Sequence, residues 1–255
     1  MGAHLYSARW KKVAWFIRRF GLAEVFKKPL RMAFAPLIIS RLPKGEFTYQ
    51  TRRLEYFYHR YNMTWASERC VEVPIALEAI ARHRGEHILE VGNVLSHYQP
   101  VTHDLVDKYE PGPTGIAKDI AEYVPTEPYG LIISISTFEH IGFDDDAATS
   151  SADKILAALQ NCRRMLQPSG ELVVTVPIGY NPELDRMISR RELGAERETF
   201  LGRRTALEWR ECSREEALAC QYRRPFPYAN AIMVAEFGSV YPELTNATKT
   251  STGHP

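Results

Sequence analysis

Short apolar segments alternate along this chain with longer segments whose apolar residues recur every three or four positions. The pattern predicts helices over 69–82 and 152–166, and strands over 87–91, 103–107, 114–117, 131–136 and 171–176. Because strands that alternate with helices form mainly parallel sheets covered on both faces, we expect an α/β fold. The segments 206–212 and 230–237 are expected to add the final, partly antiparallel strands.

Two turns at the ends of the first predicted strands indicate a nucleoside site. Gly92 follows the strand 87–91, and Asp107 ends the next apolar segment, with Glu110 as an alternative acid. A glycine there permits close approach of a ligand, and the acid can accept hydrogen bonds from both ribose hydroxyls. The turn is not G-x-G-x-x-G, because residues 93–96 are Asn-Val-Leu-Ser. That disfavours a dinucleotide, whose pyrophosphate needs a glycine loop and a helix N-terminus.

Three further motifs follow downstream: GIAKDI (115–120), YGLIISISTFEHIGFDD (129–145) and LQPSGELVVTVPIGYNP (166–182). With the two turns, they resemble the class I S-adenosylmethionine-dependent methyltransferases over roughly residues 68–182, in a little-characterised subgroup with a GNVLSHY-type first motif. The matching residues are Glu90, Gly92, Asp107, Asp119, Ser134, Ser136, Glu139, His140, Pro168, Gly170 and Pro177. The chain departs from the family pattern in its glycine loop, which keeps only Gly92, at Gly130, and at Ser169 of the Pro-Ser-Gly turn.

The resemblance implies a Rossmann-like, doubly wound, mostly parallel sheet with helices on both faces, and S-adenosylmethionine as the cofactor. It places Glu90 near the methionyl amine, Asp107 on the ribose and Asp119 near the adenine. Ligands of such sheets bind beyond the carboxyl ends of the strands, so the expected cofactor-binding set is Glu90, Gly92, Asn93, Asp107, Asp119, Ile120 and Ser136. Two alternatives stay open: Glu90 could only tie down a neighbouring loop, and Asp119 could cap a short helix.

Methyl transfer from a sulfonium is an in-line displacement, so the protein must align the acceptor and, for a hydroxyl, remove its proton. His140 is the first candidate for the base, with Glu139 beside it. Tyr180, Asn181 and Asp185 are the candidates for the acceptor pocket. The alternative for Glu139 and His140 is that they begin the helix after the fourth strand and only cap or pack there.

Composition places the chain among globular enzymes, with 45% hydrophobic and 25% charged residues in 255. Its four cysteines form no C-x-x-C pair and show no metal-ligand spacing with histidine, so we expect reduced thiols and no metal site. Charge is uneven: residues 1–45 hold ten basic residues and one acid, whereas the rest holds 22 basic and 30 acidic residues, a formal net charge of −8. An acidic main domain disfavours a nucleic-acid partner.

The basic N-terminal segment also carries apolar residues at roughly helical spacing, the composition of an interfacial amphipathic helix. Peripheral membrane contact through residues 9–41 and packing on the protein itself or on a second subunit are both open. The predicted organisation is a basic amphipathic N-terminal helical appendage (1–45), an aromatic-rich connector (46–67), a cofactor-binding methyltransferase domain (68–240) and a disordered tail (241–255). We expect a cytoplasmic protein, with a peripheral position at a membrane surface as the alternative.

The sequence therefore favours an S-adenosylmethionine-dependent methyltransferase that acts on an oxygen of a small polar metabolite or a glycan-linked acceptor. Two other classes stay open. One is a non-catalytic protein that binds the cofactor or a nucleoside, which the reduced glycine loop motivates. The other is a nucleotide-dependent oxidoreductase or nucleotide-sugar enzyme, against which the missing G-x-G-x-x-G counts.

Overall fold

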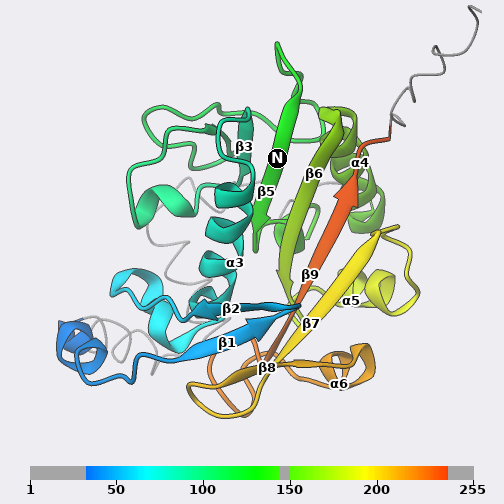
Figure 1. Cartoon of the computed structure of the whole chain (residues 1–255). Helices are drawn as coiled ribbons and strands as arrows, with labels where there is room; N and C mark the ends of the chain where they lie inside the picture. Colours follow the sequence, from blue (N-terminus) through cyan, green and yellow to red (C-terminus); the bar gives the residue numbers. More distant parts are fainter. Residues whose placement is uncertain (1–32, 144–149, 241–255) are drawn as a thin grey trace, which may run out of the picture.

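A seven-stranded mixed sheet forms the centre of the molecule in the computed structural model, which describes residues 33–143 and 150–240 (Figure 1). The strand order is β4-β3-β5-β6-β9-β7-β8. The strands are β3 (Ile88–Val91), β4 (Asp104–Val106), β5 (Tyr129–Ile135), β6 (Leu166–Pro177), β7 (Arg197–Arg203), β8 (Trp209–Cys212) and β9 (Ala231–Gly238).

The first four strands of this sheet are parallel and wind in two directions. From β3 the chain moves outward to β4 and then returns to the other side of β3 as β5, followed by β6. The remaining strands are antiparallel: β9 pairs with β6, and β7 lies between β9 and β8. The strand order thus reverses between β3 and β5, and such a switch point opens a crevice at the carboxyl ends of the strands. The predicted Rossmann-like, doubly wound fold class is confirmed.

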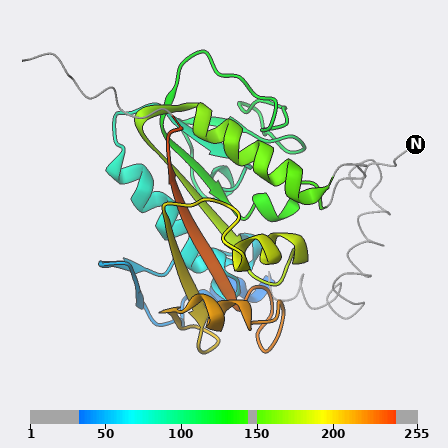
Figure 2. The ribbon, with the colours of Figure 1, turned by 90° about the vertical axis from the view of Figure 1, so that its right-hand side faces the viewer.

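Helices cover both faces of the sheet. Helix α3 (Arg69–Arg82) packs on one face through Val71, Ile75 and Ala79, which join a core with Ile133 of β5. On the other face, helices α4 (Ser151–Arg164) and α5 (Pro182–Ser189) share a second core (Figure 2). A short helix, α6 (Arg214–Leu218), precedes the loop to β9, and its first turn is fixed by a capping box between Ser213 and Glu216.

The expected strand at 114–117 does not form. This segment makes only an isolated parallel bridge between Ile116 and Val106, with hydrogen bonds from Ile116 N to Leu105 O (2.8 Å) and from Asp107 N to Ile116 O (3.1 Å). The physical reason lies just upstream, because residues 111–114 are Pro-Gly-Pro-Thr, and prolines lack the N–H group that a strand ladder needs. The backbone still follows the expected course at the edge of β4.

Elements outside the predicted set complete the fold. The aromatic-rich connector contains a hairpin of β1 (Glu46–Tyr49) and β2 (Arg52–Glu55), whose Phe47 and Tyr49 are buried in the core with α3. The predicted amphipathic segment lies mostly outside the described residues, as does the tail from 241, and residues 33–39 are helical. Within residues 33–143 and 150–240 no helix is long and apolar enough to cross a membrane.

Candidate functional site

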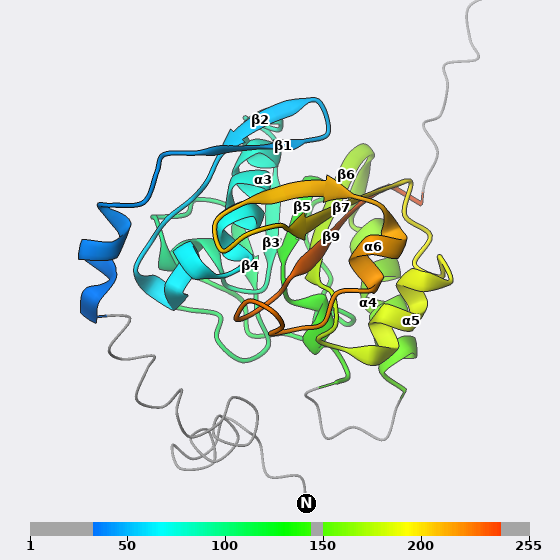
Figure 3. The ribbon, with the colours of Figure 1, turned by 90° about the horizontal axis from the view of Figure 1, so that it is seen from below.

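The carboxyl ends of β3, β4, β5 and β6 meet at one edge of the sheet, onto which Figure 3 looks from below. Gly92, Asp107, Ser136 and Pro177 stand at these four ends. The site residues predicted from the sequence were expected at this edge, and the strand register places the backbones of Gly92, Asp107 and Ser136 there.

Gly92 and Asp107 bring the first two strand ends into contact. Gly92 has a φ of +87°, and a Cβ added to it would lie 2.1 Å from Oγ1 of Thr137, the residue that follows the end of β5 by two positions. A larger residue is therefore disfavoured both by backbone strain and by the close approach of the Thr137 side chain. Asn93, next in the turn, donates its backbone N–H to Oδ2 of Asp107 at 3.0 Å. The Asp107 side chain is half-buried.

The other carboxylate oxygen of Asp107 fixes its own loop. Oδ1 accepts the backbone N–H groups of Tyr109 (2.8 Å) and Glu110 (2.7 Å). The carbonyl of Glu110 in turn accepts a bond from the Asn93 side chain at 2.9 Å. Because an ionised carboxylate offers about four lone-pair sites, Asp107 is oriented by these three bonds and retains capacity for a further donor. Glu110, the alternative acid, takes part in these contacts through its backbone N–H and carbonyl groups.

Glu90 is fully buried and ties down the loop that follows Gly92. Its Oε1 accepts the backbone N–H groups of Val94 and Leu95, each at 2.8 Å, and its Oε2 lies 2.8 Å from Nε2 of His103. The alternative role foreseen from the sequence, holding a neighbouring loop, is thus present in the structure. A contact with the methionyl amine stays a prediction. His103 was not identified from the sequence, because nothing but its position just before β4 distinguishes it.

An aromatic layer covers the same loop. It comes from the 3-10 segment η1 (Tyr61–Ala66), whose Tyr61 ring stacks on His97 at 4.5 Å between centroids. Thr64 Oγ1 also bonds to the Tyr98 hydroxyl at 3.2 Å. Asn62 and Met63, within this segment, both have φ of +49°. Two consecutive non-glycine residues in the left-handed region are costly and concentrate at ligand sites.

Ser136 sits at the centre of a buried polar network that the sequence analysis missed. Its backbone is left-handed (φ +41°), and its hydroxyl donates to Oε1 of Glu72 at 2.6 Å. The same oxygen accepts a hydrogen bond from Oγ1 of Thr175 at 2.9 Å. The other carboxylate oxygen of Glu72, Oε2, forms an ion pair with Nη1 of Arg69 at 2.6 Å. Glu72 is fully buried. The signal was present, since Glu72 is a lone acid within the apolar stretch CVEVPIAL.

Glu139 and His140 lie together beyond β5 in a 3-10 turn, η3 (Phe138–His140). Burial raises the pKa of Glu139 to about 7, against the charges of His140 and Arg69, which lower it. Its Oε1 is 3.6 Å from Nε2 of His140, and its Oε2 is buried without a hydrogen-bond partner. The His140 side chain is 45% exposed, so it can reach a ligand directly. Helix α4 begins at Ser151, so the two residues do not form its first turn.

Of the three candidate acceptor residues, Tyr180 packs its ring against His140, whereas Asn181 and Asp185 form hydrogen bonds that hold nearby loops. The ring of Tyr180 packs edge-on against His140, with 4.9 Å between centroids. Asn181 is the N-cap of α5: its Oδ1 accepts the N–H groups of Glu183 and Leu184, and its Nδ2 donates to the Glu139 carbonyl at 3.0 Å. Both oxygens of Asp185 accept the N–H of Gly179. Burial raises the pKa of Asp185 to about 6.

Asp119 and Ile120 lie at the start of the segment after Ile116. Asp119 Oδ1 accepts the backbone N–H of Ala121 at 3.1 Å, and its Oδ2 pairs with Lys108 Nζ at 3.0 Å. Only a turn follows Asp119, so this bond holds that turn and does not cap the short helix of the alternative prediction. Ile120 is buried in the core shared with α4, and its carbonyl accepts the Asn161 side chain at 2.7 Å. A cofactor contact of either residue stays a prediction.

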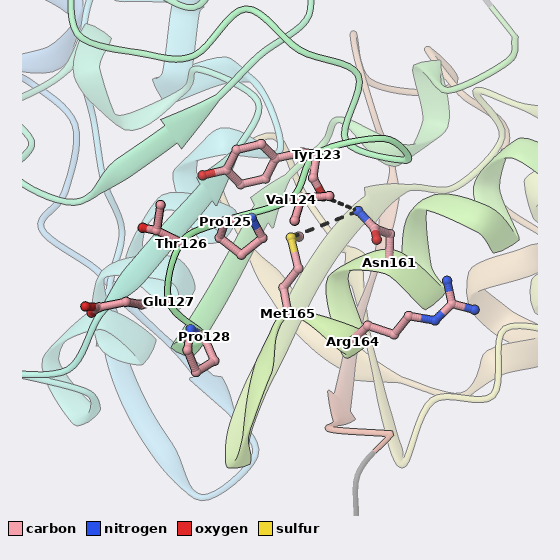
Figure 4. Close-up of a pocket in the computed structure, with 9 residues that line it drawn as sticks. All are labelled: Tyr123, Val124, Pro125, Thr126, Glu127, Pro128, Asn161, Arg164 and Met165. Atoms are coloured by element: carbon pink, nitrogen blue, oxygen red, sulfur yellow. Dashed lines mark hydrogen bonds between the residues drawn. The ribbon is translucent and has the colours of Figure 1, made fainter.

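A cavity of about 290 Å³ lies at the opposite, amino edge of the sheet, and of the predicted site residues Ile120 contacts its wall. It is lined by the turn 123–128 and by Asn161, Arg164 and Met165 (Figure 4). The side-chain amide of Asn161 in this wall donates hydrogen bonds to the carbonyls of Ile120 and Tyr123. Over the residues that the structure describes, no group of three or more His, Cys, Asp or Glu side chains is arranged to hold a metal ion.

Comparison with known proteins gives structural neighbours only. No family model and no curated protein sequence matches the chain. It is similar to the N-methyltransferase NodS from Bradyrhizobium japonicum WM9 in complex with S-adenosylhomocysteine, at 12% identity over 68% of this chain and 88% of that one, with a TM-score of 0.44. It is also similar to the glycopeptide N-methyltransferase MtfA, at 9% identity over 64% of this chain and 88% of that one, with a TM-score of 0.37. A TehB-like S-adenosylmethionine-dependent methyltransferase from Corynebacterium glutamicum ATCC 13032 Kitasato is similar at 18% identity over 64% of this chain and 84% of that one, with a TM-score of 0.37.

Proposed function

We propose that this protein is an S-adenosylmethionine-dependent methyltransferase. The observation that carries the proposal is the pairing of Asp107 with the Gly92–Asn93 turn at the point where the strand order reverses. A tight glycine turn at the first strand end and an oriented, half-buried carboxylate at the second are the parts that a ribose and its attached group require. The motifs after β5 and in β6 add the family resemblance.

The same geometry speaks against a dinucleotide. The turn after Gly92 leads into one short 3-10 segment, η2 (Leu95–His97), and not into a long helix. Moreover, the N–H groups of Val94 and Leu95, which a phosphate would need, already donate to Glu90. A cofactor without phosphate groups is not disadvantaged by this arrangement. S-adenosylmethionine is such a cofactor, whereas NAD and the nucleotide sugars are not.

For the acceptor, we propose an oxygen of a small polar or glycan-linked molecule, with His140 as the group that removes the hydroxyl proton. His140 is exposed, contacts the ring of Tyr180, and stands beside the buried carboxyl group of Glu139. A neutral His140 would accept the hydroxyl proton, and the ionised carboxylate of Glu139 would stabilise the imidazolium that forms. Tyr180 would form the wall that keeps water from the reacting atoms.

Thermal denaturation in the presence of ligands separates this proposal from its alternatives. A ligand that binds only the folded state raises the midpoint of unfolding, and the rise grows with the logarithm of the ligand concentration relative to Kd. We expect S-adenosylhomocysteine to raise the midpoint, and NAD and a nucleotide sugar at the same concentration to leave it unchanged. Stabilisation by NAD alone would replace the methyltransferase with an oxidoreductase. Binding of S-adenosylhomocysteine without methyl transfer to any hydroxyl acceptor in a broad screen would support the non-catalytic alternative.

A further inference from the structure

A second cavity, of about 550 Å³, lies at the carboxyl edge of the sheet and is lined by two arginines and no acidic residue. It is formed where Arg203 ends β7 and where the loop from α6 to β9 passes beneath it, with Cys220, Gln221, Arg224 and Asn230 in its wall. Because Gly202 pairs with Ala231 and Ala231 bonds to Ile178, this place is on the same edge as the end of β6.

Arg203 is held rigidly and forms no ion pair within the described residues, although the buried carboxyl group of Glu68 acts on its charge from a longer distance. Its guanidinium lies over the rings of Phe226 (5.0 Å) and Trp209 (5.8 Å). Its Nη atoms donate to three backbone carbonyls, those of Ala66, Pro227 and Ala206. No carboxylate of the described residues comes within ion-pair distance of it, and its Nε is buried without a hydrogen-bond partner. Burial lowers the pKa of Arg203, which means that its charge is kept at a cost that a nearby anion would reduce.

Arg224 supplies the second, accessible charge from a loop of fixed shape. The Asn230 side chain is buried and holds this loop through Gln221, Phe226 and Tyr228: its Nδ2 donates to all three carbonyls, and its Oδ1 accepts the Phe226 N–H. Arg224 itself is exposed and forms no ion pair within the part of the chain that the structure describes. Two arginines thus line one cavity whose loop backbone is already ordered, which lowers the entropy lost on binding.

The cavity adjoins the proposed catalytic residues. The loop of Gly179 packs closely against the cavity wall, since a Cβ on Gly179 would lie 2.8 Å from the backbone nitrogen of Tyr222. The Tyr222 ring meets the Tyr180 ring edge-on at 5.3 Å, and Tyr180 in turn contacts His140. The rings of Tyr180 and Tyr222 therefore connect His140 to the wall of this cavity.

We propose that this cavity binds an anionic group, a phosphate or a carboxylate, carried by the methyl acceptor. Planar guanidinium groups match the paired oxygens of both anions. The assignment of the anion to the acceptor rests on the proposed function, whereas the binding of an anion by Arg203 and Arg224 does not. A phosphate-bearing glycan intermediate and a sugar acid share this chemistry.

The test uses the full chain and two simple anions, inorganic pyrophosphate and malonate, titrated at low ionic strength while backbone amide NMR shifts are followed. We expect saturable shifts confined to residues 202–204 and 219–231, with affinity reduced at least about tenfold in Arg224→Ala. Arg84→Ala, which removes an exposed arginine beyond the end of α3, is the matched control and should bind like the parent protein. A stronger response to pyrophosphate would identify phosphate as the preferred group, and a stronger response to malonate would identify a carboxylate.

Two results would overturn the inference: no saturable shift in this region, or equal affinity in Arg224→Ala and the parent protein. Titration of the same proteins with S-adenosylhomocysteine keeps the two proposals separate. If S-adenosylhomocysteine binds and the anions do not, the cavity assignment fails alone. If the anions bind through Arg224 and S-adenosylhomocysteine does not bind, the anion site stands, while its link to a methyl acceptor falls with the proposed function.

Discussion

The hydroxyl of Ser136 donates to Oε1 of Glu72 at 2.6 Å and so joins the end of β5 to helix α3. This bond lies beside the switch point of the sheet, because β5 is one of the two strands between which the order reverses. Glu72 is fully buried and also accepts Thr175 and pairs with Arg69. A satisfied buried network of this kind fixes a single local structure. Ser136 is thereby held in a left-handed conformation (φ +41°) that a serine adopts only under such constraint.

Removal of Arg69 is expected to destabilise the protein strongly. In Arg69→Met the carboxylate of Glu72 is left buried without its ion-pair partner, and breaking a buried pair in this way costs about 3–5 kcal/mol. Urea denaturation measures the difference in the free energy of unfolding. The double variant Arg69→Met/Glu72→Gln should recover part of the loss, because no uncompensated charge remains. A loss below about 1 kcal/mol in the single variant would show that the pair does not hold this edge together.

Gly92 and Gly85 form a matched pair for testing the close approach of the two loops. Both have a positive φ, +87° and +92°, but a Cβ at Gly92 would meet Thr137, whereas nothing lies within 4 Å at Gly85. Alanine at Gly85 should cost only the backbone penalty of about 1–2 kcal/mol. Alanine at Gly92 should lower the free energy of unfolding by clearly more than this, and it should also weaken cofactor binding. Equal losses in urea denaturation would mean that Thr137 moves aside freely.

The buried carboxyl group of Glu139 predicts a defined pH dependence of stability. Its pKa is raised to about 7 by burial, above the ordinary value of 4.5. Between these two values the folded state keeps a proton that the unfolded state has lost, so the contribution of Glu139 to stability falls as the pH rises and levels off above about 7. Glu139→Gln should therefore match the parent protein near pH 4.5 and exceed it by up to about 3 kcal/mol at pH 8. A difference that stays constant with pH would contradict the raised pKa.

The sequence was sufficient for the parallel half of the fold. In β3, β5 and β6 the apolar runs are buried on both faces, and in α4 the apolar stripe faces the core, so periodicity and burial agree. The predicted strand at 114–117 was wrong: the segment is apolar, but the prolines before it prevent a strand ladder. β7 escaped notice because its buried stretch, Phe200 to Gly202, is short and flanked by charged residues. A strand of this kind is specified by its neighbours β8 and β9 more than by its own sequence.

For the site, sequence patterns located strand ends but not side-chain partners. Gly92, Asn93 and Asp107 meet as expected, because turn chemistry and strand order together determine their positions. The bonds of Glu72 and Ser136, by contrast, join residues 64 positions apart. Such a pairing follows from the way α3 packs across β5, which no local pattern encodes. No local pattern encodes the surroundings of Arg203 either, because the aromatic rings and carbonyl groups that contact it come from three separate segments.

Calorimetric titration of the full chain with S-adenosylhomocysteine tests the central claim most directly. We compare the parent protein with Asp107→Asn, Asp107→Ala and the control Glu127→Ala, which removes an exposed carboxylate at the opposite edge of the sheet. Urea denaturation of each variant confirms that it is folded. The account predicts saturable binding by the parent and the control, and affinity at least about tenfold lower in both Asp107 variants, since the loss of a hydrogen bond to a charged group costs about 1.5–3 kcal/mol. Absence of binding by the folded parent protein, or unchanged affinity in both Asp107 variants, would contradict it.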